Sequence, residues 1–342
     1  MIELRNIVKR FNNGTASETI AIDHLNLALQ EGDFITVIGG NGAGKSTLIN
    51  IIAGSIPADE GQVLLDNVDV SRVSEHKRAP FFGRVFQDPM VGTAADMTVI
   101  ENLALAYGRG RPRSLFRWSY RKDDVEFFTN ELKSLDLGLE DRLYQKVGLL
   151  SGGQRQALTL LMATIRHAPT PSRIKKDYVR FAPGDKKELK LKINTIFKNI
   201  EDAFKKRKAV IQNDASLTKE EKAQKMKEIK EIRRKDMLLY DLTKPVLLLD
   251  EHTAALDPKT AEKVLQTTEK IVNDNRLTTI MITHNMKDAI RYGNRLIMMS
   301  KGKIVADIKG EEKKKLTIET LLQMFVTNSN NDMLADSAIL GD

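Results

Sequence analysis

The segment at residues 39–46, GGNGAGKS, leaves this chain little choice of local fold. It follows FITVI at residues 34–38, an apolar run rich in β-branched residues that is typical of a strand buried on both faces. Residues 45–53 then place Leu48, Ile51 and Ile52 on one side, as in a helix. The sequence therefore predicts a strand, a glycine loop and a helix in succession, which is a βα unit.

The glycine loop matches the phosphate-loop pattern G-x-x-x-x-G-K-S in full. Glycines let the backbone curl with its N–H groups inward, where they can hydrogen-bond phosphate oxygens. Lys45 would neutralise the β- and γ-phosphates of ATP, and Ser46 would ligate Mg²⁺. The alternative, an ordinary glycine turn, is disfavoured by the flanking strand and helix. The predicted nucleotide-binding residues here are Gly39, Gly40, Asn41, Gly42, Ala43, Gly44, Lys45, Ser46 and Thr47.

Two adjacent carboxylates, Asp250 and Glu251, follow a second apolar run at residues 246–249. Neighbouring residues on a strand point in opposite directions, so the two carboxylates must have different roles. Asp250 suits the Mg²⁺ shell, and Glu251 can face the γ-phosphate and orient or deprotonate the attacking water. Without the glycine loop, this pair would equally well be read as a helix-capping motif.

Further strands and helices predict an α/β fold. Residues 2–8 and 20–29 are strand candidates, and so are residues 278–282, while residues 258–273 predict a helix. Strands that alternate with helices indicate a mostly parallel sheet, which binds ligands at the carboxyl ends of its strands. Residues 88–149 are mostly helical in pattern, interrupted by a basic and aromatic stretch at residues 109–122.

The motif Ser151-Gly152-Gly153-Gln154 precedes a predicted helix at residues 155–166. Serine is a good helix cap, and two glycines expose backbone N–H groups, so this is a second anion-binding helix end. A single ATP does not need two such ends from one subunit.

With these motifs the chain resembles the nucleotide-binding subunits of the ABC (ATP-binding cassette) family over residues 1–166 and 245 to about 328. The resemblance implies a P-loop NTPase (RecA-like) core with N-terminal antiparallel strands and a helical subdomain. It also implies a head-to-tail dimer, in which Ser151, Gly152, Gly153 and Gln154 of one subunit close over ATP held by the other.

The resemblance assigns roles to four further residues. Phe11 resembles the aromatic residue that stacks on adenine, and we favour that role, although a lone Phe near the N-terminus is usually a core packing residue. Gln87 resembles the glutamine that senses Mg²⁺ and the attacking water. Asp257 resembles the residue that reaches across the dimer, and His284 the histidine that holds the γ-phosphate. His252 departs from the family pattern, which commonly has proline after the catalytic glutamate.

Composition places limits on the class of protein. The chain is 41% hydrophobic and 29% charged, has no cysteine and contains no run of 18 apolar residues. We therefore expect a soluble protein of the cytosol without a membrane span. Net charge is +8, but residues 168–244 hold 22 Lys and Arg against 12 Asp and Glu, which leaves the rest of the chain at −2. The basic character belongs to one segment.

That basic segment, residues 167–244, predicts a helical hairpin inserted in the ATP-binding fold. Its first helix has apolar residues spaced by three and four, Asn213 to Ser216 break the pattern, and Thr218 with Glu221 forms a capping box before a second helix at residues 219–240. Three roles stay open for it: packing on itself, a docking or regulatory surface, and contact with anionic lipid or nucleic acid. The inward residues are predicted as Leu189, Ile193, Ile196, Ile200, Ala203 and Val210, then Met226, Ile229, Ile232 and Met237.

The expected domains are residues 1–87 (first part of the core), 88–166 (helical subdomain), 167–244 (hairpin), 245–328 (second part of the core) and 329–342 (flexible tail). A cassette separate from its membrane helices resembles those of importers. The chain looks like a bacterial group of cassettes for uptake of amino acids, some of them aromatic. Expected partners are a second ATP-binding subunit, membrane permease subunits and an extracytoplasmic substrate-binding protein, at the cytoplasmic side of the membrane. The alternatives are an exporter with separate subunits and a soluble ABC ATPase acting on nucleic acid.

Overall fold

The computed structural model describes residues 2–79, 81–109, 120, 122–165, 172, 174–176, 179, 184–238 and 246–328. The chain divides into two units, one made of Met1–Arg166 with Pro245–Asp342 and the other of His167–Lys244. The predicted tail at residues 329–342 and most of the basic stretch at residues 109–122 lie outside the described residues.

The larger unit is built on a six-stranded sheet in the order β10-β9-β3-β8-β7-β6. Neighbouring strands from β9 to β6 are parallel, and only β10 runs antiparallel, to β9. The strands are β3 (Phe34–Gly39), β6 (Phe82–Val85), β7 (Val246–Asp250), β8 (Thr279–Ile282), β9 (Arg295–Ser300) and β10 (Lys303–Lys309). The mostly parallel α/β sheet predicted from the sequence is confirmed.

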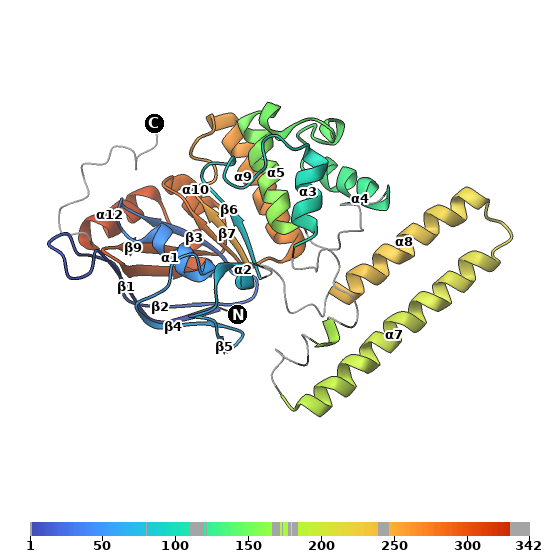
Figure 1. Cartoon of the computed structure of the whole chain (residues 1–342), viewed down its shortest axis with the longest axis horizontal. Coiled ribbons are helices and arrows are strands. Elements are labelled where there is room, and N and C mark those ends of the chain that lie inside the picture. Colours follow the sequence, from blue (N-terminus) through green and yellow to red (C-terminus); the bar gives the residue numbers. More distant parts are fainter. Residues whose placement is uncertain are drawn as a thin grey trace. The chain divides into compact units, whose positions relative to one another are not determined.

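Both faces of this sheet are covered, as the uninterrupted apolar strands require. In β7, Val246 and Leu248 pack into one hydrophobic cluster, whereas Leu247 and Leu249 pack into another. The first cluster contains α1 (Lys45–Ala53) and an antiparallel sheet of β2 (Thr19–Leu29), β1 (Ile2–Phe11), β4 (Glu60–Leu65) and β5 (Val68–Asp69) (Figure 1). The other face carries α5 (Gly152–Thr164), α9 (Pro258–Asn275), α10 (Met286–Arg291) and α12 (Ile318–Asn328).

Part of the chain that connects β6 to β7 forms helices of the larger unit. A separate hydrophobic cluster joins α5 to α3 (Val99–Tyr107) and α4 (Lys122–Lys133). Helix α5 also contributes Leu160 and Ala163 to the cluster on the sheet face. Helix α5 therefore packs against α3 and α4 and also against the sheet. The short remaining elements are α2 (Glu75–Arg78), α11 (Gly310–Lys314) and the 3-10 turns η1 (Glu140–Arg142) and η2 (Val147–Leu149).

The smaller unit is a helical hairpin of α7 (Lys186–Asn213) and α8 (Lys219–Leu238), which lie antiparallel (Figure 1). Thr218 and Glu221 form the predicted capping box, with Glu221 accepting from the Thr218 N–H at 2.8 Å. Two of the predicted inward residues are wrong. Val210 is 69% exposed, and the following residue, Ile211, is buried instead. Ile232 is 41% exposed, whereas Ile229 and Met237 on the same helix are buried as predicted. Tyr240, the predicted end of the second helix, lies outside the described residues.

Candidate functional site

The glycine loop connects the carboxyl end of β3 to α1 and lies against neighbouring strands. Gly44 has φ 95°, and a Cβ there would lie 2.3 Å from the Ala21 carbonyl oxygen in β2. At Gly39 a Cβ would lie 2.3 Å from the Met299 carbonyl oxygen in β9. Only glycine allows these approaches. Among the described residues no side chain caps α1, whose first N–H groups are therefore free to bind an anion.

Lys45 begins α1 and folds back over the loop. Its Nζ donates to the carbonyl oxygens of Gly39 at 2.8 Å and Gly40 at 3.0 Å, and its side chain is buried. Burial lowers the pKa of Lys45, and the nearby carboxylates of Glu251 and Asp250 act in the opposite direction. The ammonium thus lies inside the loop, where it can exchange carbonyl partners for phosphate oxygens.

Asp250 ends β7 at the same edge of the sheet. The Ser46 hydroxyl donates to Asp250 Oδ1 at 3.2 Å, and burial raises the pKa of Asp250. Two oxygen ligands on adjacent corners of an octahedral Mg²⁺ site lie about 3 Å apart, given metal–oxygen distances of about 2.1 Å. The two oxygens therefore fit Mg²⁺ in both chemistry and spacing.

Glu251 follows β7, and His284 lies two residues after β8 (Thr279–Ile282). His284 Nε2 is 2.5 Å from Glu251 Oε1, and this hydrogen bond is the main reason why the pKa of Glu251 is lowered. Glu251 has φ 47°, a left-handed conformation that non-glycine residues seldom adopt and that functional sites often hold. Lys45, Ser46, Asp250, Glu251 and His284 thus lie together at the carboxyl edge of the parallel strands.

Gln87 and Phe11 stand at the margins of this group. Gln87 is exposed and lies two residues after β6, the strand that pairs with β7. Phe11 ends β1, is 37% exposed and pairs with Thr19, two residues from the Ala21 backbone against which the glycine loop lies. Lys9 Nζ lies 5.6 Å from the Phe11 ring centroid. Phe11 is thus a partly exposed ring near the loop rather than a core residue.

At the second glycine motif, Ser151 to Gln154, the helix begins earlier in the chain than predicted. Helix α5 starts at Gly152, not at residue 155, because Ser151 caps it. The Ser151 hydroxyl accepts from the Gln154 N–H at 3.3 Å, and Gln154 Oε1 accepts from the Ser151 N–H at 3.2 Å. This reciprocal capping box places both glycines in the first helical turn. The predicted end, Arg166, lies outside the described residues, and α5 ends at Thr164.

The start of α5 packs against the start of α9. A Cβ on Gly153 would lie 2.2 Å from Thr260 Cγ2, and one on Gly152 would lie 3.2 Å from Leu256 Cδ2. Asp257 caps α9 by accepting from the Thr260 N–H at 3.1 Å. The Ser151 motif and Asp257 therefore lie side by side on two adjoining helix ends.

Two residues near the carboxylates were not predicted. Arg84 in β6 donates to Asn50 at 2.5 Å and to Ser55 at 3.0 Å, and its positive charge favours ionised Asp250. The sequence feature that could have revealed Arg84 is its position as a charged residue within the short strand FGRV. His252 is buried, and its Nε2 lies 3.1 Å from Thr268 Oγ1 in α9. The sequence showed only that this position lacks proline.

The chain is similar to known proteins of one family. The ABC transporter family model matches residues 22–170. A tyrosine transport ATP-binding protein of Clostridioides difficile is 34% identical over 326 residues, 95% of this chain and 98% of that protein. A phosphonates import ATP-binding protein of Lactococcus lactis is 26% identical, covering 91% of this chain and 94% of its own length.

A solved structure shares the fold. It is the dimeric post-hydrolysis state of the cassette MJ0796 of Methanocaldococcus jannaschii, bound to ADP and Pi. It superimposes with a TM-score of 0.57 at 22% identity and covers 90% of this chain and 98% of its own.

Proposed function

This chain belongs to the ABC transporter family of ATPases, and we propose from that premise that it powers import of a small solute, an amino acid, through separate membrane subunits. The ATPase activity follows from the family. The observation that supports amino-acid import is the near full-length likeness to the tyrosine transport protein. Because that match covers 95% of this chain, it takes in most of residues 167–244 as well as the core.

The residues at the carboxyl edge suggest how ATP is hydrolysed. The loop N–H groups and Lys45 would bind the phosphates, and Ser46 and Asp250 would hold Mg²⁺, which neutralises phosphate charge. His284 donates to Glu251, and a γ-phosphate would offer it a second acceptor. Transfer of that hydrogen bond would release Glu251 to orient and deprotonate the attacking water, with Gln87 beside it.

A second subunit completes the site in this proposal. Ser151 to Gln154 form an anion-binding helix end beside Asp257. The contacts of this helix end are with the start of α9 and not with the chain's own glycine loop. Two copies arranged head to tail would place this motif over the partner's ATP. Phe11 would stack on the adenine.

Membrane partners would dock beside Gln87. Among the described helices, none combines the length and the apolar character that crossing a bilayer requires. Met90 and Val91, just after Gln87, are 40% and 65% exposed. Apolar side chains at that place would suit a helix of a permease subunit at the cytoplasmic face of the membrane. In an importer, an extracytoplasmic binding protein would deliver the solute.

Replacing Glu251 with glutamine tests the catalytic assignment. Glu251→Gln keeps the side chain's size but removes the base, so we expect ATP hydrolysis to fall at least a hundredfold while ATP binding persists and a dimer accumulates. The control is Glu262→Gln, an exposed α9 carboxylate paired with Arg291, which should hydrolyse ATP normally. Hydrolysis retained by Glu251→Gln would refute the role of Glu251.

Co-purification tests the transport assignment. The tagged chain, expressed in its native host, should bring down integral membrane subunits, and reconstituted vesicles should take up a radiolabelled amino acid only with ATP present. Salt-sensitive retention of DNA or RNA without membrane subunits would instead support a nucleic-acid ATPase. ATP-dependent efflux from the vesicles would indicate an exporter.

A further inference from the structure

Arg84 connects the edge of the six-stranded sheet to the helix that follows the glycine loop. It lies in β6, paired with Leu248 of β7, two residues before Asp250. Its two terminal nitrogens donate to Asn50 Oδ1 at 2.5 Å and to Ser55 Oγ at 3.0 Å. Asn50 belongs to α1, and Ser55 lies two residues after that helix. The guanidinium therefore joins β6 to the second half of α1.

The remaining surroundings of Arg84 orient its guanidinium. Its side chain is only 16% exposed, and its Cζ lies 4.5 Å from the centroid of the Phe86 ring. A planar guanidinium stacks on an aromatic face at such a distance. Glu75 is 3.9 Å away and mostly exposed, so this ion pair contributes little. Two directional hydrogen bonds and one stacked ring thus fix the plane of the group.

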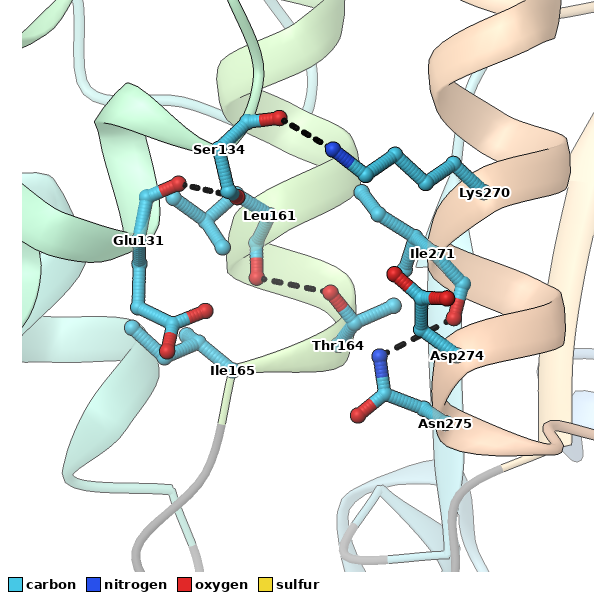
Figure 2. A pocket seen from close by; sticks show the side chains of 9 residues that line it. All are labelled: Glu131, Ser134, Leu161, Thr164, Ile165, Lys270, Ile271, Asp274 and Asn275. Carbon is cyan, nitrogen blue, oxygen red and sulfur yellow. Dashed lines mark hydrogen bonds between the residues drawn. The ribbon is translucent and has the colours of Figure 1, made fainter. Parts of the chain in front are cut away.

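Strand β6 is a firm base for this side chain. A Cβ on Gly83 would lie 2.3 Å from the Ala163 carbonyl oxygen in the last turn of α5, and Val85 packs with Ala163 in one hydrophobic cluster. Figure 2 shows this end of α5 between α4 and α9, with Leu161 lining the pocket between them. Helix α5 therefore holds one face of β6, and Arg84 extends from the other face, towards α1.

The hydrogen bond to Asn50 restrains the rotation of α1 about its own axis. The other inward side chains of the helix, among them Leu48 and Ile52, pack into an apolar cluster, and such contacts have no fixed direction. Asn50 lies one turn after Ser46, on the same side of α1. The orientation of Asn50 therefore sets that of Ser46, whose hydroxyl lies 3.2 Å from Asp250 Oδ1.

A second arginine also binds α1, but it connects the helix to another part of the chain. Arg78 donates to the carbonyl oxygens of Ile51 and Ile52, both at 2.9 Å. Its other acceptors are carbonyl oxygens within residues 70–73, which follow β5 of the antiparallel sheet. Arg84 is thus the arginine that connects α1 to the strands of the six-stranded sheet.

We propose that Arg84 is a positioning residue for magnesium. By holding Asn50 it keeps Ser46 and Asp250 in the arrangement that one Mg²⁺ needs, because this ion accepts only small departures from octahedral geometry. Arg84 acts through α1 and does not bind the metal itself. The inference rests on the assignment of Ser46 and Asp250 to Mg²⁺ in the proposed function.

Arg84→Lys tests this role without changing the local charge. A single ammonium group cannot hold Asn50 and Ser55 and also stack flat on Phe86. The probe is a β,γ-imido analogue of ATP with a fluorescent N-methylanthraniloyl group, bound to the full chain during titration with Mg²⁺. The half-saturating Mg²⁺ concentration should rise about tenfold, as is usual when a residue that orients a metal ligand is lost. In EDTA the affinity for the analogue should not change, since the glycine loop and Lys45 are intact.

Further variants separate positioning from a general loss of stability. Asn50→Ala removes the acceptor and should raise the half-saturating Mg²⁺ concentration by a similar factor. The double variant should be little worse than either single variant, because both remove the same contact. The control is Arg5→Lys, an exposed arginine of β1 paired with Glu3, which should bind the analogue like the wild type. Weakening of the analogue to the same extent in EDTA and in Mg²⁺ would show a merely structural role and overturn the proposal.

The outcomes also distinguish this role from the proposed function. If Mg²⁺ strengthens binding of the analogue to the wild type and Arg84→Lys responds in the same way, the role of Arg84 is refuted and the assignment of the metal ligands stands. If Mg²⁺ has no effect on the wild type, the assignment of Ser46 and Asp250 fails, and the role of Arg84 fails with it.

Discussion

At the scale of single residues, the surroundings of His252 determine its charge. The Thr268 hydroxyl donates to the Val264 carbonyl oxygen at 2.8 Å, so its oxygen must accept the hydrogen bond from His252 Nε2. His252 Nε2 therefore carries a proton. Full burial lowers the pKa of His252 to about 4, so the ring is neutral at pH 7. The residue attaches the loop after Glu251 to α9.

This buried histidine predicts a loss of stability in acid. In the unfolded chain His252 has its ordinary pKa of about 6.5, so between pH 6.5 and 4 the unfolded state binds a proton that the folded state does not. The free energy of unfolding must then fall as pH decreases through this range, by up to roughly 3 kcal/mol. Urea unfolding at pH 7 and pH 5 measures the change.

A variant isolates the contribution of His252 from that of other groups. His252→Gln has no titrating ring but can still donate to Thr268. Its loss of stability from pH 7 to pH 5 should be smaller than that of the wild type by about 2 kcal/mol. The same loss in both proteins would show that His252 is not the group responsible.

The residues near the phosphate site differ in how far the sequence reveals them. Lys45, Ser46, Asp250 and Glu251 occur in short motifs whose spacing follows from the chemistry, and the structure brings them together. Their functional roles stay predictions. Arg84 and His252 have no such motif, because a buried polar side chain is explained by partners distant in sequence, here Asn50 and Thr268.

At the scale of elements, the contact between α5 and α9 depends on Gly153. Alanine there would place Cβ 2.2 Å from Thr260 Cγ2, a stiff β-branched side chain, so one helix must move. We expect Gly153→Ala to lose about 1–3 kcal/mol of stability, although alanine favours a helix over glycine. Thermal unfolding measures the loss.

The adjacent glycine supplies the control. At Gly152 a Cβ would lie 3.2 Å from Leu256 Cδ2, the flexible end of a leucine. Gly152→Ala should therefore be close to neutral in stability. Equal unfolding temperatures for the two variants would contradict the close approach at Gly153.

The elements were predicted best where the signal is local. The bounds of α1 follow from the glycine loop before it and Gly54 after it. The start of α5 was predicted three residues late because glycines usually lie outside helices, although the Ser151-x-x-Gln154 pattern of a capping box was present. In α7 the sequence predicted Val210 as the inward residue seven positions after Ala203. The buried residue is Ile211 instead, on the same side of the helix as the buried Phe197.

At the scale of the whole molecule, strand pairing was the least predictable feature. The sequence indicates a parallel sheet, but β3 pairs with β8 and β9, strands 245 to 260 residues further along. Such pairing depends on contacts distant in sequence, which no local pattern encodes. Strand β9, RLIMMS, was not predicted at all, and its first residue, Arg295, is a buried charge that pairs with Asp307 of β10.

If two subunits share each ATP site, two inactive variants should restore activity when mixed. Lys45→Ala removes the phosphate-binding ammonium. Ser151→Asp keeps a good helix cap but sets a negative charge against the partner's nucleotide. In a mixed dimer, one site combines the intact Lys45 of one chain with the intact Ser151 of the other, and the second site carries both changes. Each variant alone should be inactive.

The size of the restoration follows from the symmetry of the dimer. With equal mixing half of the dimers are mixed, and each has one intact site of two, so ATPase activity should reach about a quarter of the wild-type rate. The measurement is the ATPase rate after the two variants are unfolded and refolded together, with mixed dimers counted through two different affinity tags. Mixed dimers without activity would contradict a site shared between subunits, since a site contained in one chain predicts no restoration. Activity of Ser151→Asp on its own would show that the partner's helix end is not required.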